Sequence, residues 1–237
     1  KFSFVGKLSS TLRYGENPHQ SAILYKSSMQ NSGIPQATLL QGKELSYNNI
    51  NDADAALQLI KEFEEATPTV AIIKHANPCG VASGSTLHEA YTKAFSCDTT
   101  SAFGGIIALN QTIDKDSAEQ IVKIFTEVII APGITDEAKA IFKTKNNLRV
   151  LILTSLHEKN NSQNFKSIEG GILVQSNDDE STDKSDLKVV TEKKPSDSEI
   201  EDMLFAFKVC KHVKSNAIIY VKNKKNNWYR CWTNEPS

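Results

Sequence analysis

The sequence predicts a layered α/β fold, with a largely parallel sheet covered by helices and a second, incomplete α/β unit near the C-terminus. Helical and strand-like patterns alternate through residues 51–153, which is typical of α/β domains. The strand candidates are short runs of consecutive apolar residues, as in strands that are buried on both faces. Most of the helical stripes follow a Ser, Thr, Asp or Asn that can cap the helix.

Each predicted strand is a short run rich in apolar or β-branched residues. In chain order these runs are residues 2–5, 21–25, 70–73, 106–109, 128–131, 150–153, 171–175 and 217–221. The run at 70–73 is typical of a buried parallel strand, and it leads directly into Lys74 and His75. Asn77-Pro78 and Gly80 then predict a turn that ends the strand abruptly.

The helices are predicted from apolar stripes of helical spacing and from their capping residues. Asn51-Asp52 is expected to cap the first helix, while Thr86-x-x-Glu89 and Ser196-x-x-Glu199 each have the spacing of a capping box. A further helix is expected to start at Asp114 or Asp116, and another to cover residues 135–142.

These elements divide the chain into three regions. Residues 1–155 form the first α/β unit, and residues 196–237 begin a second one. Between them, residues 156–195 are a polar connection with one short strand, mobile and solvated over 176–195. No internal repeat, P-loop or dinucleotide-binding fingerprint is evident.

Composition narrows the class of protein. The 237 residues carry 27 Lys and Arg against 28 Asp and Glu, so net charge gives no attraction to nucleic acid or to a membrane surface. No apolar run is long enough to span a bilayer, and no signal-peptide pattern opens the chain. The four cysteines form no C-x-x-C pair, which favours reduced thiols in a cytoplasmic protein.

The pair Lys74-His75 is the most informative candidate site. It places an ammonium group and an imidazole at the end of a core strand, where open α/β sheets bind their ligands. A proton acceptor that works near neutral pH, beside a fixed positive charge, suits a reaction that removes a proton while negative charge develops nearby. The alternative is a solvated strand end without function, which is the commoner fate of an isolated Lys-His pair.

Several polar segments lie at the ends of predicted elements and together resemble a known family. They are residues 12–20 (LRYGENPHQ), 45–50 (LSYNNI), 73–80 (IKHANPCG), 100–105 (TSAFGG), 128–132 (VIIAP) and 211–217 (KHVKSNA). In this order they closely resemble the AICAR transformylase domain of the bifunctional purine-biosynthesis enzymes, which join AICAR formyltransferase to IMP cyclohydrolase. The likeness covers the chain from about residue 12 to residue 223.

The resemblance implies transfer of a formyl group from 10-formyltetrahydrofolate to the 5-amino group of AICAR, in the biosynthesis of IMP. That amine is conjugated with a ring and a carboxamide, so it is a poor nucleophile that needs its proton removed as it attacks. By resemblance, His75 accepts the proton. Lys74 stabilises the transition state and assists the departing folate nitrogen, which fits general-base and electrostatic catalysis.

Further substrate contacts are implied by matching positions in the family. The implied substrate-binding residues are Arg13, Tyr14, His19, Asn49, His75, Gly104, Glu127 and Asn216. Ordinary alternatives exist for three of them: a surface ion pair for Arg13, a simple turn for Gly104 and a helix-to-strand loop for Asn216. His88 and His212 are expected to be surface histidines.

The family fold consists of two layered α/β/α units that resemble cytidine deaminase but lack its catalytic zinc. The segment from His75 to Cys79 is similar to the deaminase signature, but Asn77 stands at the Glu position and the second Cys is absent. We therefore expect no metal. The resemblance also implies AICAR and a folate as small-molecule partners, and a homodimer whose active sites are built across subunits.

The chain departs from the family at both ends, because it lacks the preceding cyclohydrolase domain and the expected segment Gly-Ile-Gly-Ala-Gly-Gln-Met-Ser-Arg after residue 227. The codons TGG TAT CGG TGC TGG ACA AAT GAG CCG T can encode residues 228–236. Without their first base they encode that expected segment. This predicts a frameshift near Asn227, a tail of foreign sequence from about residue 228, and little formyl transfer by this chain alone.

Two other functions remain open on the sequence. One is a noncatalytic nucleotide-binding or regulatory remnant, which keeps Arg13, Tyr14 and His75 without the folate half of the site. The other is a product of gene decay that does not fold stably.

Overall fold

The computed structural model describes residues 3, 5–27, 32–158, 163–214 and 216–231, and the side chains of 227–231 are not described. The helices are α1 (Tyr47–Ile60), α2 (Leu87–Phe95), α3 (Lys115–Ile121), α4 (Asp136–Phe142) and α5 (Asp197–Cys210), with the 3-10 helices η1 (Ile34–Gln36) and η2 (Lys184–Asp186). The strands are β1 (Gly6–Leu12), β2 (Ala22–Ser27), β3 (Thr38–Gln41), β4 (Thr69–Lys74), β5 (Asn77–Ser83), β6 (Ile106–Leu109), β7 (Val128–Ala131), β8 (Arg149–Ile152), β9 (Gln163–Ile168), β10 (Gly171–Ser176), β11 (Ala217–Val221) and β12 (Asn226–Cys231).

A six-stranded sheet in the order β3-β8-β7-β6-β4-β5 is the centre of the protein. Only β6, β7 and β8 are parallel neighbours, whereas β4 pairs antiparallel with both β5 and β6, and β3 pairs antiparallel with β8. The prediction of an α/β fold is confirmed, but the expectation of a largely parallel sheet, with a parallel strand at residues 70–73, is wrong.

The physical reason lies in how β4 is buried. Val70 and Ile72 pack into one apolar cluster with α2, while Ala71 and Ile73 pack into the other with α1. A strand covered on both faces is apolar throughout, whatever the direction of its neighbours, so the run alone does not distinguish parallel from antiparallel pairing. The tight connection to β5 decides the direction, because adjacent strands joined by two residues must be antiparallel.

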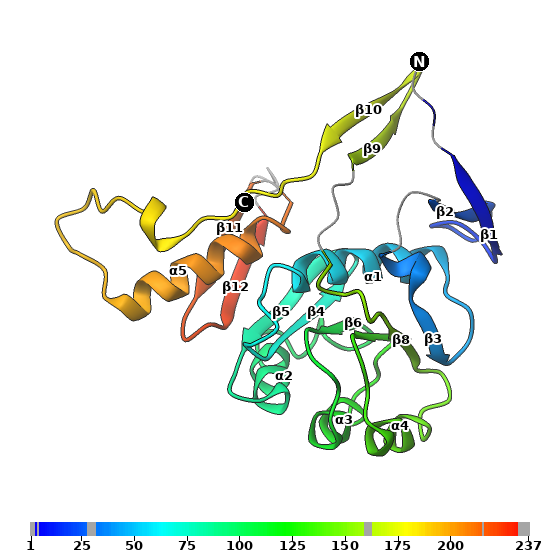
Figure 1. The fold of residues 1–237 in the computed structure, drawn as a ribbon, viewed down its shortest axis with the longest axis horizontal. Coiled ribbons are helices and arrows are strands. Elements are labelled where there is room, and N and C mark those ends of the chain that lie inside the picture. The colour runs from blue at the N-terminus through cyan, green and yellow to red at the C-terminus, as the bar shows by residue number, and fades with distance from the viewer. Residues whose placement is uncertain (1–2, 4, 28–31, 159–162, 215, 232–237) are drawn as a thin grey trace.

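Helices cover both faces of this sheet. Figure 1 shows α1 on one side and α2, α3 and α4 on the other. The inner faces of α2, α3 and α4 contribute Leu87, Ala118 and Phe142 to one cluster, whereas α1 contributes Leu57 and Ile60 to the other. The layered arrangement therefore follows from the apolar stripes that the sequence displays.

Helix α5 and the hairpin β11–β12 pack beside the first unit, on the α1 side of the sheet (Figure 1). Phe205 and Val209 of α5 belong to the same apolar cluster as α1, and the Phe205 ring centroid lies 5.1 Å from that of Phe63. The expected capping box at Ser196 is present, since its hydroxyl accepts from Glu199 N and the Glu199 carboxylate accepts from Ser196 N.

The structure contains an internal repeat that the sequence reading missed. Both α1 and α5 have 14 residues and a capping box at a Ser, and each is followed by a hairpin with two central turn residues, which in the second copy are enclosed by the hydrogen bond from Lys222 N to the Lys225 carbonyl. In both turns the two central residues are non-glycine residues with positive φ. Few side chains are identical between the copies, so the repeat is visible mainly in the backbone.

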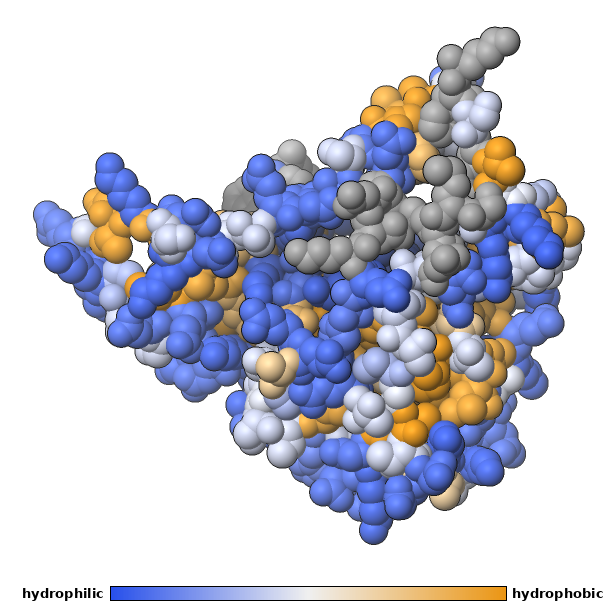
Figure 2. Space-filling model, viewed as in Figure 1, coloured by the Kyte–Doolittle hydropathy of each residue, from blue (hydrophilic) through white to orange (hydrophobic). Residues whose placement is uncertain are grey.

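Two hairpins, β1–β2 and β9–β10, project from the body (Figure 1). The predicted strand at 21–25 corresponds to β2, and the one at 171–175 to β10, whereas β9 was not expected because it is rich in polar residues. Figure 2 shows apolar side chains at the surface of the projecting part. On β9–β10 the exposed apolar residues are Phe165, Ile168, Ile172, Leu173 and Val174.

The predicted strand at 2–5 lies partly outside the described residues, and β1 begins at Gly6. Residues 232–237 of the predicted frameshifted tail also lie outside them. In the described part of the chain, no helix combines the length and the apolar character needed to cross a membrane.

Candidate functional site

The Lys74-His75 pair lies at a hairpin turn. Lys74 is the last residue of β4 and pairs with Asn77, the first residue of β5, so His75 and Ala76 alone make the turn. Their φ angles are 52° and 55°, as in a type I′ turn, which normally takes Asn and Gly. The expectation that Asn77-Pro78 forms the turn is wrong, because both residues already belong to β5, an edge strand that tolerates proline.

Hydrogen bonds from both sides fix the backbone of His75. Its N–H donates to Asp52 Oδ2 of α1 over 3.1 Å, and its carbonyl accepts from Asn77 Nδ2 over 2.9 Å. The His75 residue is nevertheless exposed. A fixed backbone with an accessible imidazole is the arrangement that a proton acceptor requires.

Lys74 points to the loop that precedes β6. Its Nζ donates to the carbonyl of Phe103 over 2.8 Å, and the Phe103 ring lies 5.5 Å from that of Phe125. Gly104 has a φ of 71°, and its N–H donates to the Phe125 carbonyl. Gly105 passes so close to β4 that a Cβ there would lie 2.9 Å from the Ile73 carbonyl oxygen.

An acidic side chain enters the site at the start of β7. Glu127 accepts a hydrogen bond of 2.6 Å from Nδ2 of Asn49, which is buried in the first turn of α1. The Asn49 side chain also accepts from Ser46 N, as part of the capping box at the true start of the helix. The expected cap at Asn51-Asp52 is therefore wrong, because Ser46 starts the helix five residues earlier.

Arg13, Tyr14 and His19 lie in the connection between β1 and β2. The Arg13 guanidinium lies over the Tyr14 ring, 5.5 Å from its centroid, and both Arg13 and His19 are exposed. One hydrogen bond ties this connection to α1, from Asn48 Nδ2 to the carbonyl of Glu16 over 3.2 Å. It therefore approaches the same helix end that carries Asn49.

Most of the predicted residues thus gather around one end of the sheet. Lys74 and His75 at the end of β4 lie beside Gly104 before β6 and Glu127 before β7, and the first turns of α1 face them through Asn49 and Asp52. Since β4 runs antiparallel to β6, the C-terminal end of β4 lies at the same end of the sheet as the N-terminal ends of β6 and β7. Asn216 is exposed at the start of β11 and is not joined to the cluster by these hydrogen bonds.

Two groups near the turn have shifted pKa values. Burial raises the pKa of the Cys79 thiol to about 12, so this buried thiol stays protonated at neutral pH. Hydrogen bonds from Ser101 and Thr100 lower the pKa of Asp98 and keep it ionised at the start of the Phe103 loop. Within the described ranges, no three His, Cys, Asp or Glu side chains gather as a metal-binding group.

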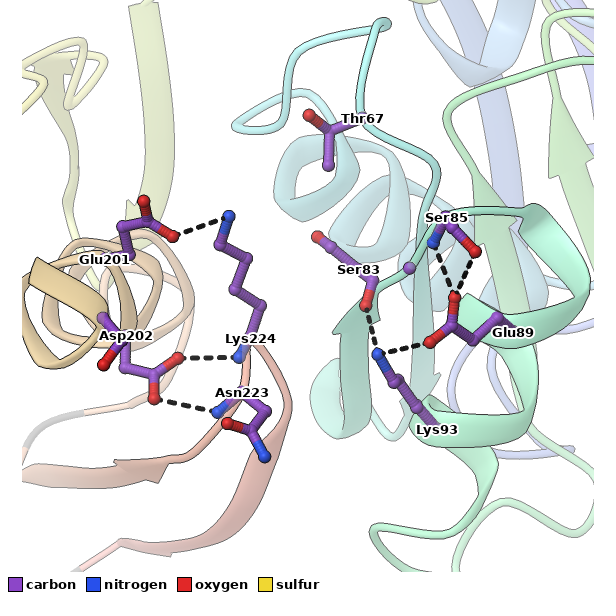
Figure 3. A pocket seen from close by; sticks show the side chains of 11 residues that line it. Thr67, Ser83, Ser85, Glu89, Lys93, Glu201, Asp202, Asn223 and Lys224 are labelled. Carbon is purple, nitrogen blue, oxygen red and sulfur yellow. Dashed lines mark hydrogen bonds and ion pairs between the residues drawn. The ribbon is translucent and has the colours of Figure 1, made fainter.

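A cavity with a volume of about 490 Å³ lies away from this cluster, between the end of β5 and the segments α5 and Asn223–Lys224 (Figure 3). Its lining includes Ser83, Lys93, Asp202 and Lys224, and none of the predicted site residues. Its charged groups are paired, Lys93 with Glu89 over 2.8 Å and Lys224 with Glu201 over 3.0 Å. The volume of this cavity is therefore not evidence that it is the reactive site.

Sequence reasoning missed Asp52, which it treated only as a helix cap. Its partner is a backbone N–H 23 positions further along the chain, and a backbone group leaves no signal in the side-chain pattern. Phe103, whose carbonyl binds Lys74, was part of a recognised motif but was not singled out for the same reason.

These features define an α/β protein with a mixed central sheet and a cluster of polar side chains at one edge of it. Residues 1–227 match the family described as the AICARFT/IMPCHase bienzyme, and the chain belongs to that family. Residues 228–237 lie outside the match. The resemblance inferred from the sequence motifs is thereby confirmed.

Curated relatives agree with this assignment. The chain is 58% identical over 223 residues to the bifunctional purine biosynthesis proteins PurH of Ruegeria sp. strain TM1040 and of Ruegeria pomeroyi. It is 57% identical over 223 residues to PurH of Brucella anthropi. In the first case the match covers 93% of this chain and 42% of the relative. The chain thus spans about two fifths of the length of the curated relatives it matches.

Proposed function

We propose that this chain carries the formyl-transfer site of an AICAR formyltransferase acting in IMP biosynthesis. The single observation that carries the proposal is the Lys74-His75 turn. It combines a fixed, left-handed backbone with an exposed imidazole and a neighbouring ammonium group. Two successive left-handed non-glycine residues cost conformational energy, and such costs concentrate at functional sites.

His75 is the proton acceptor in this proposal. As the AICAR amine attacks the formyl carbon of 10-formyltetrahydrofolate, a new N–C bond forms and the amine proton passes to the imidazole. The bond between the formyl carbon and the folate nitrogen then breaks, and that nitrogen takes up a proton. General-base catalysis of this kind contributes roughly 10²–10⁴-fold to a rate.

Lys74 stabilises the negative charge that develops on the formyl oxygen. One of its three N–H bonds is directed to the Phe103 carbonyl, which leaves two for a substrate. Because the anchor is a backbone carbonyl, the ammonium group is held near the turn without a direct ion pair to any described carboxylate, and Asp98 is close enough only for a longer-range electrostatic interaction.

Arg13, Tyr14, Asn49, Gly104 and Glu127 are proposed to bind the nucleotide. Arg13 suits a phosphate or a carboxamide oxygen. The exposure of Arg13 and the bond between Asn48 and Glu16 support a nucleotide position between the β1–β2 connection and α1. His19 and Asn216 are proposed as additional contacts on the resemblance alone.

Other properties belong to the same proposal. They are a layering of each unit like that of cytidine deaminase, a homodimer, 10-formyltetrahydrofolate as co-substrate without a required metal, and a cytoplasmic location. The relatives named above are called bifunctional, and we propose no cyclohydrolase activity for these residues.

Calorimetric titration of the 237-residue chain with AICAR, followed by an assay of formyl transfer from 10-formyltetrahydrofolate, tests the proposal. We expect AICAR to bind, and binding to weaken at least tenfold in Arg13→Gln. Binding without transfer would favour a noncatalytic nucleotide-binding remnant for this chain. If AICAR does not bind to the folded chain, the proposed function is contradicted.

A further inference from the structure

Two hairpin turns in the structure share an unusual conformation. His75 and Ala76 have φ angles of 52° and 55°, and Asn223 and Lys224 have φ angles of 56° and 52°. Residues with a Cβ rarely occupy this left-handed region, and two in succession require support from the surroundings.

In both turns an Asp carboxylate from the preceding long helix accepts hydrogen bonds from backbone N–H groups. Asp52 of α1 accepts from the N–H of His75, while Asp202 of α5 accepts from Asn223 N over 2.8 Å and from Lys224 N over 2.7 Å. Figure 3 shows the Asp202 carboxylate directed at the second turn. Each Asp is the sixth residue after the Ser that caps its helix, so the two copies of the repeat place it equivalently.

The contacts of Asp52 suggest no other role. Its only hydrogen-bond partner among the described residues is the His75 N–H. Hydrogen bonds to a charged acceptor are stronger than neutral ones, so this contact favours the left-handed conformation of the turn.

The second turn has the same type of aspartate–backbone contact but no imidazole. Asn223 stands where the first copy has His75, and the Lys224 ammonium group is paired with Glu201 over 3.0 Å. Both turn N–H groups are bound by Asp202, and the Lys224 carbonyl accepts from Ser83 N. The second turn is thus fixed in the same way as the first, but it carries Asn223 in place of the imidazole and Lys224 in place of Ala76.

We propose that Asp52 is a positioning residue, which fixes His75 in the left-handed conformation and thereby directs its imidazole to the substrate. The backbone part of this inference is independent of the proposed function, while its catalytic consequence rests on it. Asp52 itself touches neither the substrate nor the reacting atoms.

Amide hydrogen exchange of His75, measured by NMR on the 237-residue chain, tests the inference. In Asp52→Ala we expect exchange at His75 to become about tenfold faster, while the amides of β6 and β7 are unchanged. Asp54→Ala is the matched control, because it removes the same charge from the same helix two residues away. Unchanged exchange at His75, or an equal change in both variants, would overturn the inference.

A rescue experiment separates conformation from general damage. We expect Asp52→Ala to weaken AICAR binding, because His75 is then no longer held in its turn conformation. Glycine adopts left-handed φ without cost, so Ala76→Gly in the Asp52→Ala background should restore part of this affinity. If Asp52→Ala does not fold, Asp52→Asn keeps the volume, and we expect it to accelerate His75 exchange less strongly. An affinity loss that Ala76→Gly leaves untouched contradicts the conformational role. If the unmodified chain binds no AICAR, the proposed function fails, and the exchange data still decide the role of Asp52.

Discussion

Lys74 and His75 can serve one reaction because a two-residue turn changes the direction of the chain between them and the next strand. On a continuous strand, neighbouring side chains point to opposite faces of the sheet. Here β4 ends at Lys74, and the left-handed backbone of His75 releases the imidazole from that alternation. The surrounding groups then act mainly by holding backbone and loop atoms in place.

Removing the Asn49 side chain should destabilise the folded site without changing Lys74 or His75. Asn49→Ala removes a buried bond to the Glu127 carboxylate and half of the capping box of α1. We expect the free energy of unfolding to fall by about 2 kcal/mol in urea denaturation. Asn48→Ala is the control, because Asn48 is exposed and its one side-chain bond reaches Glu16; a loss as large as that of Asn49→Ala would contradict this interpretation.

The buried Cys79 thiol should make stability depend on pH in the alkaline range. Burial raises its folded-state pKa from 9.0 to about 12, so between these values the unfolded chain loses a proton that the folded chain keeps. Stability must therefore fall as pH rises through this window. From pH 8 to pH 10 we expect Cys79→Ala to lose about 1 kcal/mol less stability than the unmodified chain. Equal losses of stability in Cys79→Ala and in the unmodified chain would contradict the raised pKa of Cys79.

At this scale the sequence motifs indicate the residues of the proposed site, but not the group that holds the backbone of His75. Lys74, His75, Asn49 and Glu127 stand in motifs whose resemblance to the family identifies them. Asp52 could not be found in this way, because its partner is a backbone N–H that comes near only when the hairpin forms.

At the scale of elements, β5 shows how closely the helix layer approaches the sheet. A Cβ added at Gly80 would overlap the carbonyl of Ala94 near the end of α2. The backbones of β5 and α2 therefore touch directly, and only glycine permits this contact.

Gly80→Ala should consequently separate α2 from β5. We expect a loss of about 2–3 kcal/mol in the free energy of unfolding, the range found for overpacked cores. Gly171→Ala in β10 is the matched control, since its Cβ would meet Ile168 only at 3.7 Å, and its effect should stay within about 0.5 kcal/mol. If the two variants are equally stable, the close approach at Gly80 is wrong.

Local causes predicted most helix starts, although the cap of α1 was expected at Asn51-Asp52 and lies at Ser46. The caps at Thr86, Asp114 and Ser196 start α2, α3 and α5 as expected, because a cap needs only a few adjacent residues. The antiparallel pairing of β4 with β6 joins segments on either side of α2, and local patterns do not encode it.

At the scale of the whole molecule, α5 and the β11–β12 hairpin meet the main sheet and α1 through apolar packing, backbone hydrogen bonds such as that from Ser83 N to the Lys224 carbonyl, and an ionic cluster. Glu62, just after α1, accepts from Lys211 Nζ and His212 Nε2 at the end of α5, both at 3.0 Å. His212 was expected to be a surface residue, but it is partly buried in this contact. Burial alone would raise the pKa of Glu62, yet the hydrogen bonds from His212 and Lys211 outweigh it and lower the pKa.

Glu62→Gln should weaken the contact between the units in a pH-dependent way. A lowered carboxyl pKa stabilises the folded chain above the ordinary value of 4.5, and this contribution is lost as pH falls below it. We expect the variant to lose about 1–2 kcal/mol at pH 7, and the difference to shrink below pH 4.5. Glu65→Gln, which changes an exposed carboxylate nearby, should show no such difference; if it does, the cluster is not the cause.

The C-terminal tail carries a separate prediction. The family match ends at Asn227, where the codon argument places a frameshift. Nucleotide sequencing across codons 223–237 should find bases that encode Gly-Ile-Gly-Ala-Gly-Gln-Met-Ser-Arg in the shifted frame. Codons incompatible with that frame would refute the prediction.

The most direct test of the central claim is the rate of formyl transfer with and without the His75 imidazole. The matching 223-residue segment of the Ruegeria sp. relative can be replaced by that of this chain, so that the rest of the relative's sequence is supplied. We predict that His75→Gln in this chimera lowers kcat for AICAR formylation by about 10²-fold or more, with AICAR still bound. An unchanged kcat would contradict the assignment of His75 as the proton acceptor.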